Sequence, residues 1–178
     1  MSVGMKKQQV ILVNKNNKKI GIKEKIKAHK GGNLHRAFSI FVFNSKMEVL
    51  IQQRSKKKYI SGELWSNTVC SHPKPGESYF KAVHRRLKEE MGFDCKLKKL
   101  FCFIYCAKFK NDLIENEYDC VFIGKFDGEP KPNREEIMDF RWVSLKELKK
   151  DMLKNPNKYS IWSKIAIKKI KLSQINSL

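Results

Sequence analysis

Residues 65–92 have the sequence WSNTVCSHPKPGESYFKAVHRRLKEEMG, in which a short apolar segment leads into a charged helix. Residues 64–70 predict a strand that ends at the thiol of Cys70, and the imidazole of His72 follows directly. A Pro-Lys-Pro-Gly loop separates this strand from a helix predicted over residues 79–91, which is rich in arginine and glutamate. The sequence therefore predicts that the reactive side chains Cys70 and His72 lie beside a helix whose carboxylates can bind a metal.

The predicted helix has suitable capping residues and apolar spacing. Ser78 is a good N-cap, and Gly92 occupies the C′ position. The side chains expected to face the core recur at helical spacing: Phe80, Val83, Leu87 and Met91. On the other faces we expect His84 and the charged residues Arg85, Arg86, Glu89 and Glu90.

Upstream of this stretch the pattern predicts, in order, a β-hairpin, a helical turn and two strands: residues 9–13 with 18–22, residues 23–30, residues 34–43 and residues 49–53. Gly31 and Gly32 break the chain between His29 and His35. Two imidazoles on either side of a flexible bend can converge on one point.

Downstream the pattern predicts a hairpin, a strand and two helices: residues 99–107 with 117–126, residues 140–143, residues 145–153 capped by Ser144 and ended by Pro156, and an amphipathic helix marked by Ile161, Trp162, Ile165, Ala166 and Ile170. Strands occur on both sides of helices without the regular alternation of a parallel sheet. We therefore predict an α+β fold with a mixed sheet.

Length and composition predict one domain over residues 1–178, with its core at about residues 9–170 and a frayed tail at residues 171–178. The amino terminus has no apolar targeting segment, and no apolar run approaches the ~20 residues that span a bilayer. We expect a cytoplasmic protein without a membrane partner.

The net charge of +20 can indicate a nucleic-acid surface, because clustered cations gain affinity by releasing phosphate counterions. The lysines are instead scattered along the chain, and no aromatic residues are interleaved with them. A solvated surface is the favoured interpretation, and we expect no nucleic-acid partner.

Five cysteines form an odd set without a CxxC pair, so we expect reduced thiols. Three of them lie in apolar strand-like runs and are expected to be small buried hydrophobes: Cys102, Cys106 and Cys120.

Two carboxylates can complete a metal site with the histidines. Glu115 and Glu117 alternate along a predicted strand, so both side chains point to one face. With His29, His35 and His72 they form a mixed nitrogen and oxygen set that suits Mn²⁺, Zn²⁺ or Mg²⁺.

The charged helix partly resembles the Nudix box, in which a loop and helix present carboxylates to a divalent cation on a diphosphate. The matching residues are Glu77, Arg85, Glu89, Glu90 and Gly92. Ser71 stands where the box has glycine, and Arg86 where it has a glutamate. Losing that glutamate argues against a pyrophosphohydrolase, and an added arginine suits holding the phosphates intact.

Three motifs together resemble type I isopentenyl-diphosphate Δ-isomerases, which have a Nudix-like fold: residues 67–73, 85–92 and 115–117. They occur in the family's order and spacing, and the resemblance extends from about residue 9 to residue 168. It implies exchange of isopentenyl and dimethylallyl diphosphate, a small prenyl diphosphate substrate, and divalent metal without flavin or nicotinamide.

The resemblance also implies residue roles. Cys70 matches an acid/base on one face of the substrate, Glu117 the opposing acid/base and metal ligand, and Tyr105 a residue that assists proton delivery. The metal ligands are matched by His29, His35, His72, Glu115 and Glu117. Glu90 matches a residue that holds Mg²⁺ against the diphosphate.

Four cations and one aromatic match the family's substrate-binding residues: Lys25, Arg54, Lys58 and Arg86 for the diphosphate, and Trp162 for a developing carbocation. The family's usual Pro-Gly is Gly62-Glu63 in this chain, preceded by Ser61. This departure bears on the shape of the loop that carries Lys58.

The implied reaction moves a double bond through a tertiary cation, which requires two acid/base groups, a dry enclosure and an electron-rich wall. We expect an ionised Cys70 as proton acceptor, because neighbouring cations lower a thiol pKa. Two alternatives stay open. A Nudix hydrolase would release phosphate and tolerate loss of Cys70, and a basic RNA-binding module would lose affinity in salt.

Overall fold

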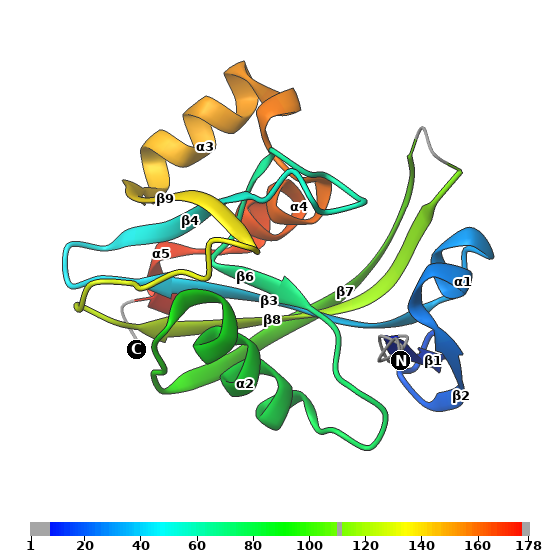
Figure 1. The fold of residues 1–178 in the computed structure, drawn as a ribbon. Coiled ribbons are helices and arrows are strands. Elements are labelled where there is room, and N and C mark those ends of the chain that lie inside the picture. The colour runs from blue at the N-terminus through cyan, green and yellow to red at the C-terminus, as the bar shows by residue number, and fades with distance from the viewer. Residues whose placement is uncertain (1–7, 110–111, 176–178) are drawn as a thin grey trace, which may run out of the picture.

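The computed structural model describes residues 8–109 and 112–175, whose strands form one nine-stranded mixed sheet (Figure 1). The strands are β1 Gln9–Val13, β2 Lys19–Glu24, β3 His35–Phe43, β4 Glu48–Arg54, β5 Trp65–Ser66, β6 Val69–Ser71, β7 Leu97–Lys108, β8 Ile114–Lys125 and β9 Ile137–Ser144. The helices are α1 Lys25–Lys30, α2 Tyr79–Met91, α3 Leu145–Lys154, a 3-10 turn Pro156–Lys158, α4 Ile161–Lys169 and α5 Leu172–Ile175. The α+β prediction is confirmed.

Strand β3 lies at the centre of the sheet. It runs parallel to β8 from the His35–Glu117 pair to the Phe43–Lys125 pair. On its other side it pairs with the short strand β6, where Ser39 is opposite Cys70. The expected partner β4 meets β3 only near the turn and pairs mainly with β9. A strand whose faces are both covered is continuously apolar, so its sequence does not reveal which strands flank it.

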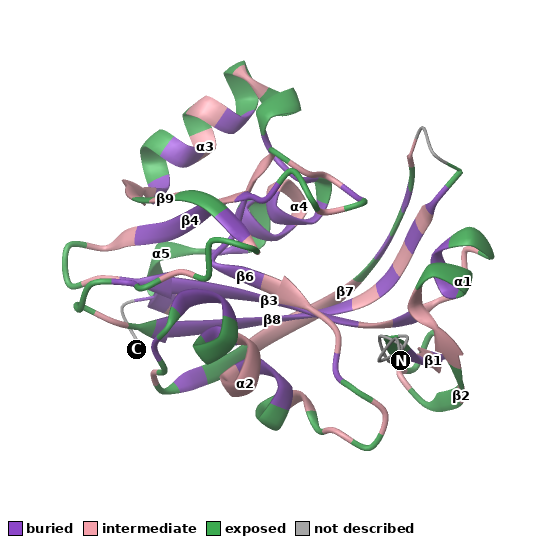
Figure 2. Cartoon of the chain, viewed as in Figure 1, coloured by how far each residue is buried: buried purple, intermediate pink, exposed green. Residues whose placement is uncertain are grey.

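Helices cover both faces of the sheet (Figures 1 and 2). Alternate residues of β3 point to opposite faces. Phe38 and Ile40 pack with Val83 and Leu87 of α2. On the opposite face, a second cluster contains Phe41, Phe43, Leu148, Ala166 and Ile167.

The predicted helix over residues 79–91 is α2, with both caps confirmed. Ser78 Oγ accepts a hydrogen bond from the Lys81 amide at 3.2 Å. Gly92 has a φ of 74°, and a Cβ at this position would lie 2.5 Å from the Lys131 carbonyl oxygen. The expectation for Phe80 is wrong, because this side chain is 64% exposed and packs on the His84 ring.

Other predicted boundaries needed smaller corrections. The strand expected over residues 64–70 is divided into β5 and β6, because the side chains between them bond to neighbouring backbones: Asn67 Nδ2 donates to Ile40 O at 3.1 Å, and Thr68 Oγ1 donates to Leu50 O at 2.7 Å. In the predicted tail, Leu172–Ile175 is helical with Ile175 buried, and residues 176–178 lie outside the described residues.

The prediction of reduced thiols is wrong for Cys102 and Cys120, and the prediction of burial is wrong for Cys106, whereas Cys120 is buried and Cys106 is a free thiol as expected. Cys102 and Cys120 are directly opposite on β7 and β8 and form a disulfide. Facing positions on adjacent strands bring two thiols within reach, which sequence spacing does not show. Cys106 is exposed near the end of the same hairpin. In the described part of the chain, no helix is both long and apolar enough to cross a membrane.

Candidate active site

One cavity of about 680 Å³ collects side chains from α1, α2, α4 and the strands β4, β6, β7 and β8. Eleven of the thirteen residues singled out from the sequence line it: Lys25, His29, Arg54, Lys58, Cys70, His72, Arg86, Tyr105, Glu115, Glu117 and Trp162. The other two, His35 and Glu90, are buried behind its wall. Segments far apart in the sequence therefore meet at one place.

Four of these residues form a group that can hold a metal ion: His29, His35, His72 and Glu117, whose ligand atoms all lie within 4.8 Å of one another. Glu117 Oε1 lies 2.8 Å from His72 Nε2 and 3.5 Å from His35 Nε2. Glu115 stands outside this group of four, although it lines the same cavity.

The histidine hydrogen bonds suit metal binding. His29 Nδ1 lies 2.7 Å from the Lys25 carbonyl oxygen, and His35 Nδ1 lies 2.7 Å from the Asn33 carbonyl oxygen. A carbonyl only accepts, so both Nδ1 atoms carry the proton and both Nε2 atoms keep a lone pair for a ligand. His35 Nε2 is buried and has no hydrogen-bond partner among the described residues. The donor set therefore fits a divalent metal.

Burial keeps the imidazoles of His29 and His72 neutral, as metal ligands must be. Desolvation lowers the pKa of His29 to about 4 and that of His72 to about 3. The hydrogen bond between His72 and Glu117 opposes this shift without cancelling it.

The two carboxylates of β8 meet the hydroxyl of Tyr105. Tyr105 Oη lies 2.6 Å from Glu117 Oε2 and 3.1 Å from Glu115 Oε2. Burial and the neighbouring Glu117 charge raise the pKa of Glu115 well above its usual range. Burial also opposes the charged form of Glu117, but the hydrogen bond to His72 counters it, and the pKa of Glu117 lies well below its usual range. This arrangement favours the proton on Glu115 and the charge on Glu117.

The thiol of Cys70 contacts a cation that also lies on an indole. Arg54 Nη1 lies 3.1 Å from Cys70 Sγ, and the guanidinium carbon is 5.1 Å from the centre of the Trp162 ring. The expected ionised Cys70 is nevertheless wrong for the substrate-free protein. Desolvation raises the pKa of the Cys70 thiol more than the Arg54 charge lowers it.

An apolar enclosure surrounds these groups. Tyr105 and Trp162 belong to a cluster with Ile60, Ala107 and Leu113, and Cys70 packs against it. The Trp162 indole N–H donates to Ser66 Oγ and Asn67 Oδ1 at 3.1 Å each, which fixes the ring. The site thus has a dry side and a rigid aromatic wall.

The other cations line the same cavity, and two of them already have carboxylate neighbours. Lys58 pairs with Glu136, and Arg86 pairs with Glu89 and Glu90. Burial lowers the pKa of Lys25 to about 8, and the nearby Lys58 charge adds to this. The chain therefore offers anion-binding groups, with Glu90 held directly against Arg86.

Sequence reasoning missed two acidic groups at this site. Glu136 lines the cavity, and its only sequence signal was a pair of glutamates in a basic chain. Asp119 is 1% exposed and accepts a hydrogen bond from Ser39 Oγ at 2.8 Å. Burial raises the pKa of Asp119 to about 8, with Glu117 adding to the shift. Its alternation with Glu117 along β8 was the available signal.

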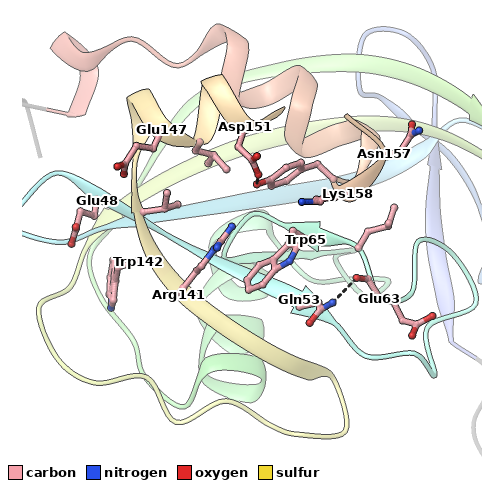
Figure 3. A pocket seen from close by; sticks show the side chains of 14 residues that line it. Glu48, Gln53, Glu63, Trp65, Arg141, Trp142, Glu147, Asp151, Asn157 and Lys158 are labelled. Atoms are coloured by element: carbon pink, nitrogen blue, oxygen red, sulfur yellow. Dashed lines mark hydrogen bonds between the residues drawn. The ribbon is translucent and has the colours of Figure 1, made fainter. Parts of the chain in front are cut away.

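A second cavity, of about 840 Å³, contains none of the residues singled out from the sequence (Figure 3). Its polar groups bind one another. Tyr159 Oη donates to Asp151 at 2.5 Å, and the Arg141 guanidinium lies 4.6 Å from the centre of the Trp65 ring. Of these two cavities, the first contains the candidate catalytic and metal-binding residues.

Comparisons with known proteins find relatives over most of the chain. The model of the NUDIX domain family matches residues 33–162. The chain is 53% identical over 154 residues to isopentenyl-diphosphate Delta-isomerase 2 of Aromatoleum aromaticum, covering 86% of this chain and 82% of that protein. It is 42% identical to isopentenyl-diphosphate Delta-isomerase of Pectobacterium atrosepticum, covering 91% and 90% of the two chains.

Solved structures share the fold at low sequence identity. The DR0079 protein of Deinococcus radiodurans has a TM-score of 0.70 at 21% identity, covering 83% of this chain and 90% of that one. The MutT NUDIX hydrolase of Burkholderia pseudomallei has a TM-score of 0.63 at 17% identity, covering 78% and 98%.

Proposed function

This chain belongs to the NUDIX family and, within it, to the isopentenyl-diphosphate Delta-isomerases, and from that premise we propose which residues carry out the reaction. The chain is an isomerase that interconverts isopentenyl and dimethylallyl diphosphate, rather than a NUDIX hydrolase. The assignment of roles rests on one observation: Cys70, Glu117 and the cations Lys25, Arg54, Lys58 and Arg86 all line the same cavity.

The reaction adds a proton at C4 of the substrate and removes one from C2, so it needs a proton donor and a proton acceptor. We assign these to Cys70 on β6 and to Glu117 on β8, which lie on the two strands flanking β3. Because the reaction is reversible, each group donates in one direction and accepts in the other. The Cys70 thiol is in the donating form before substrate binds.

Tyr105 links Glu117 to Glu115, a second carboxyl group that can hold a proton. Its hydroxyl contacts both Glu117 and Glu115, and burial favours the protonated form of Glu115. We propose that Tyr105 passes a proton between Glu117 and the substrate.

Trp162 stabilises the cationic intermediate through its ring face. Such a contact contributes about 2 kcal/mol when it is desolvated, and Trp162 is 3% exposed. The Arg54 guanidinium carbon lies 5.1 Å from the centre of the Trp162 ring, so this ring face can accept a positive charge. The apolar cluster around it keeps out the water that would capture the cation.

The His29, His35, His72 and Glu117 group would hold a divalent ion, and Glu115 is the proposed fifth ligand. Imidazoles favour Zn²⁺ over Mg²⁺, and the carboxylates also suit Mn²⁺. When bound, the ion supplies a positive charge beside Glu117. Mg²⁺ would accompany the substrate diphosphate, with Glu90 near it.

The proposed diphosphate site consists of Lys25, Arg54, Lys58 and Arg86.

A single domain over residues 1–178 is supported by the pairing of β1, upstream of the NUDIX match, with β3. The cytoplasmic location, the prenyl diphosphate as the small-molecule partner and the lack of a nucleic-acid partner stay predictions.

Proton NMR in D₂O, with isopentenyl diphosphate and Mg²⁺, tests this assignment. Wild-type protein should form dimethylallyl diphosphate that contains deuterium. Cys70→Ala should lose at least ~10²-fold in rate, the usual contribution of an acid/base group. Cys106→Ala removes an exposed thiol and should retain the rate.

Two results would contradict the proposal. Phosphate release by the wild type, or no reaction with metal present, would refute the isomerase activity. A Cys70→Ala variant that matches Cys106→Ala in rate would remove Cys70 from the acid/base pair and leave the activity in place.

A further inference from the structure

Glu136, directly before β9, places a carboxylate between two cations of the proposed diphosphate site. It forms an ion pair with Lys58, and its Oε1 lies 3.5 Å from Arg86 Nη2. The Lys58 and Glu136 side chains are only 25% and 26% exposed, so solvent screens their interaction incompletely. An anion that approaches these cations meets a negative charge already in position.

Two further carboxylates contact Arg86. Glu89 Oε2 lies 2.8 Å from Arg86 Nη1, and Glu90 pairs with Arg86 Nη2. Three carboxylates thus contact Lys58 and Arg86, and one of them, Glu89, is shared with Arg85. These carboxylates oppose the approach of a bare polyanion to the two cations.

The backbone of Glu136 is held independently of its side chain. The Glu136 carbonyl oxygen accepts a hydrogen bond from the Ser55 amide at 2.9 Å. The next residue, Ile137, pairs with Arg54 in the sheet. On the other side, Glu135 forms an exposed ion pair with Lys57. The carboxylate of Glu136 is thus not needed to attach this segment, which leaves it free for a role at the site.

We propose that Glu136 is a specificity-determining residue that makes the site select a diphosphate carrying a divalent cation over a metal-free diphosphate. A bound divalent cation offsets two of the negative charges of the ligand and so reduces its repulsion by Glu136. This inference rests on the proposed function, because it takes Lys58 and Arg86 as diphosphate-binding residues.

Calorimetric titration with inorganic pyrophosphate, with and without Mg²⁺, tests the proposal in the full-length protein. In Glu136→Gln, metal-free pyrophosphate should bind about ten-fold more tightly than in the wild type, because one unit of nearby charge is worth about 1.4 kcal/mol at a partly screened site. Affinity for the Mg²⁺ complex should change much less, so the preference for that complex narrows.

Two matched variants separate charge from structure. Glu135→Gln removes the neighbouring carboxylate, which does not itself line the cavity, although its partner Lys57 does. Because the Glu135 side chain is 73% exposed, solvent screens its charge, and this variant should keep the wild-type preference. Glu136→Asp keeps the charge and should restore most of the preference. All these variants retain the histidine site, so any pyrophosphate bound through that site contributes equally to the wild type and to each variant and does not affect their comparison.

An unchanged preference in Glu136→Gln, or equal weakening of both forms of pyrophosphate, would overturn the role of Glu136. Wild-type protein that binds pyrophosphate in neither condition would instead refute the diphosphate site, and the proposed residue roles with it.

Discussion

At the scale of single residues, Glu63 holds a backbone conformation that a glutamate rarely adopts. Its φ is 65°, in the left-handed region where a side chain crowds the following carbonyl. The resemblance to the isomerase family predicts a glycine at this position. Gln53 Nε2 donates to the Glu63 carbonyl oxygen at 3.0 Å, and the Glu63 amide donates to Arg54 O at 3.0 Å. These backbone bonds keep the strained conformation in place.

Glu63→Gly should stabilise the protein. Glycine adopts a positive φ without the steric cost, although it also increases the entropy of the unfolded chain, so the net gain should be about 0.5–1 kcal/mol. Urea denaturation measures the free energy of unfolding. Lys56→Gly is the control in the same loop, and it should destabilise because Lys56 does not have a positive φ. A loss of stability in Glu63→Gly would show that the left-handed backbone costs little.

At the scale of elements, α2 is attached to the preceding loop by one carboxylate. Arg85 Nε and Nη2 lie 2.7 and 2.8 Å from the two oxygens of Glu77. Glu77 Oε2 also accepts a hydrogen bond from the Lys74 amide at 2.8 Å. The Arg85 hydrogen bonds, with help from Lys74, hold the pKa of Glu77 below its usual range despite partial burial. Glu77 thus connects the Pro-rich loop to the second turn of the helix.

The stability contributed by Glu77 should depend on pH. Because its folded-state pKa is lowered, the contribution is complete above the unfolded pKa of about 4.3 and is lost as pH falls through the folded value. At pH 7, Glu77→Gln should cost about 1 kcal/mol, the upper end for a partly exposed ion pair. Urea denaturation at pH 7 and pH 3 should show this difference shrinking in acid.

Glu129→Gln controls for the loss of one negative charge from a strongly basic chain, since Glu129 is exposed. It should cost less than Glu77→Gln at pH 7. An equal cost in both variants, or a Glu77→Gln cost that persists at pH 3, would assign the effect to net charge or to packing.

The elements themselves could be predicted from the sequence, but their partners could not. Local periodicity and capping residues identified α2, α3 and α4, because these signals lie within each segment. The division at Asn67 and Thr68 and the exposure of Phe80 depend on what surrounds each residue. The parallel pairing of β3 with β8 depends on a connection of many residues, which leaves no local pattern.

At the scale of the whole molecule, the sheet gathers the metal-binding group from separate parts of the chain. His29 comes from α1, His35 from the start of β3, and His72 from the segment after β6. Glu117 reaches the same point because it is paired with His35 across two parallel strands. The residue types of the site were predictable from the family motifs. The burial that keeps Cys70 a thiol, and the presence of Glu136, required the folded arrangement.

Metal binding should therefore stabilise the entire fold. Zn²⁺ or Mn²⁺ at about one hundred times its dissociation constant should add about 2.7 kcal/mol and raise the Tm of chelator-treated protein by roughly 5–10 °C. His72→Gln should lose most of this increase. His84→Gln should retain it, because His84 bonds to Asp94 instead and does not belong to the group. Differential scanning calorimetry measures both. An equal increase in the two variants would place the bound ion elsewhere.

The parallel pairing of β3 and β8 also has a consequence for synthesis of the chain. About 80 residues separate Phe43 from its partner Lys125, and a ribosome adds roughly 5–20 residues per second. For several seconds, the nascent chain contains an apolar β3 whose long partner has not yet been made. We expect this interval to be when the protein is most exposed to aggregation and most dependent on chaperones.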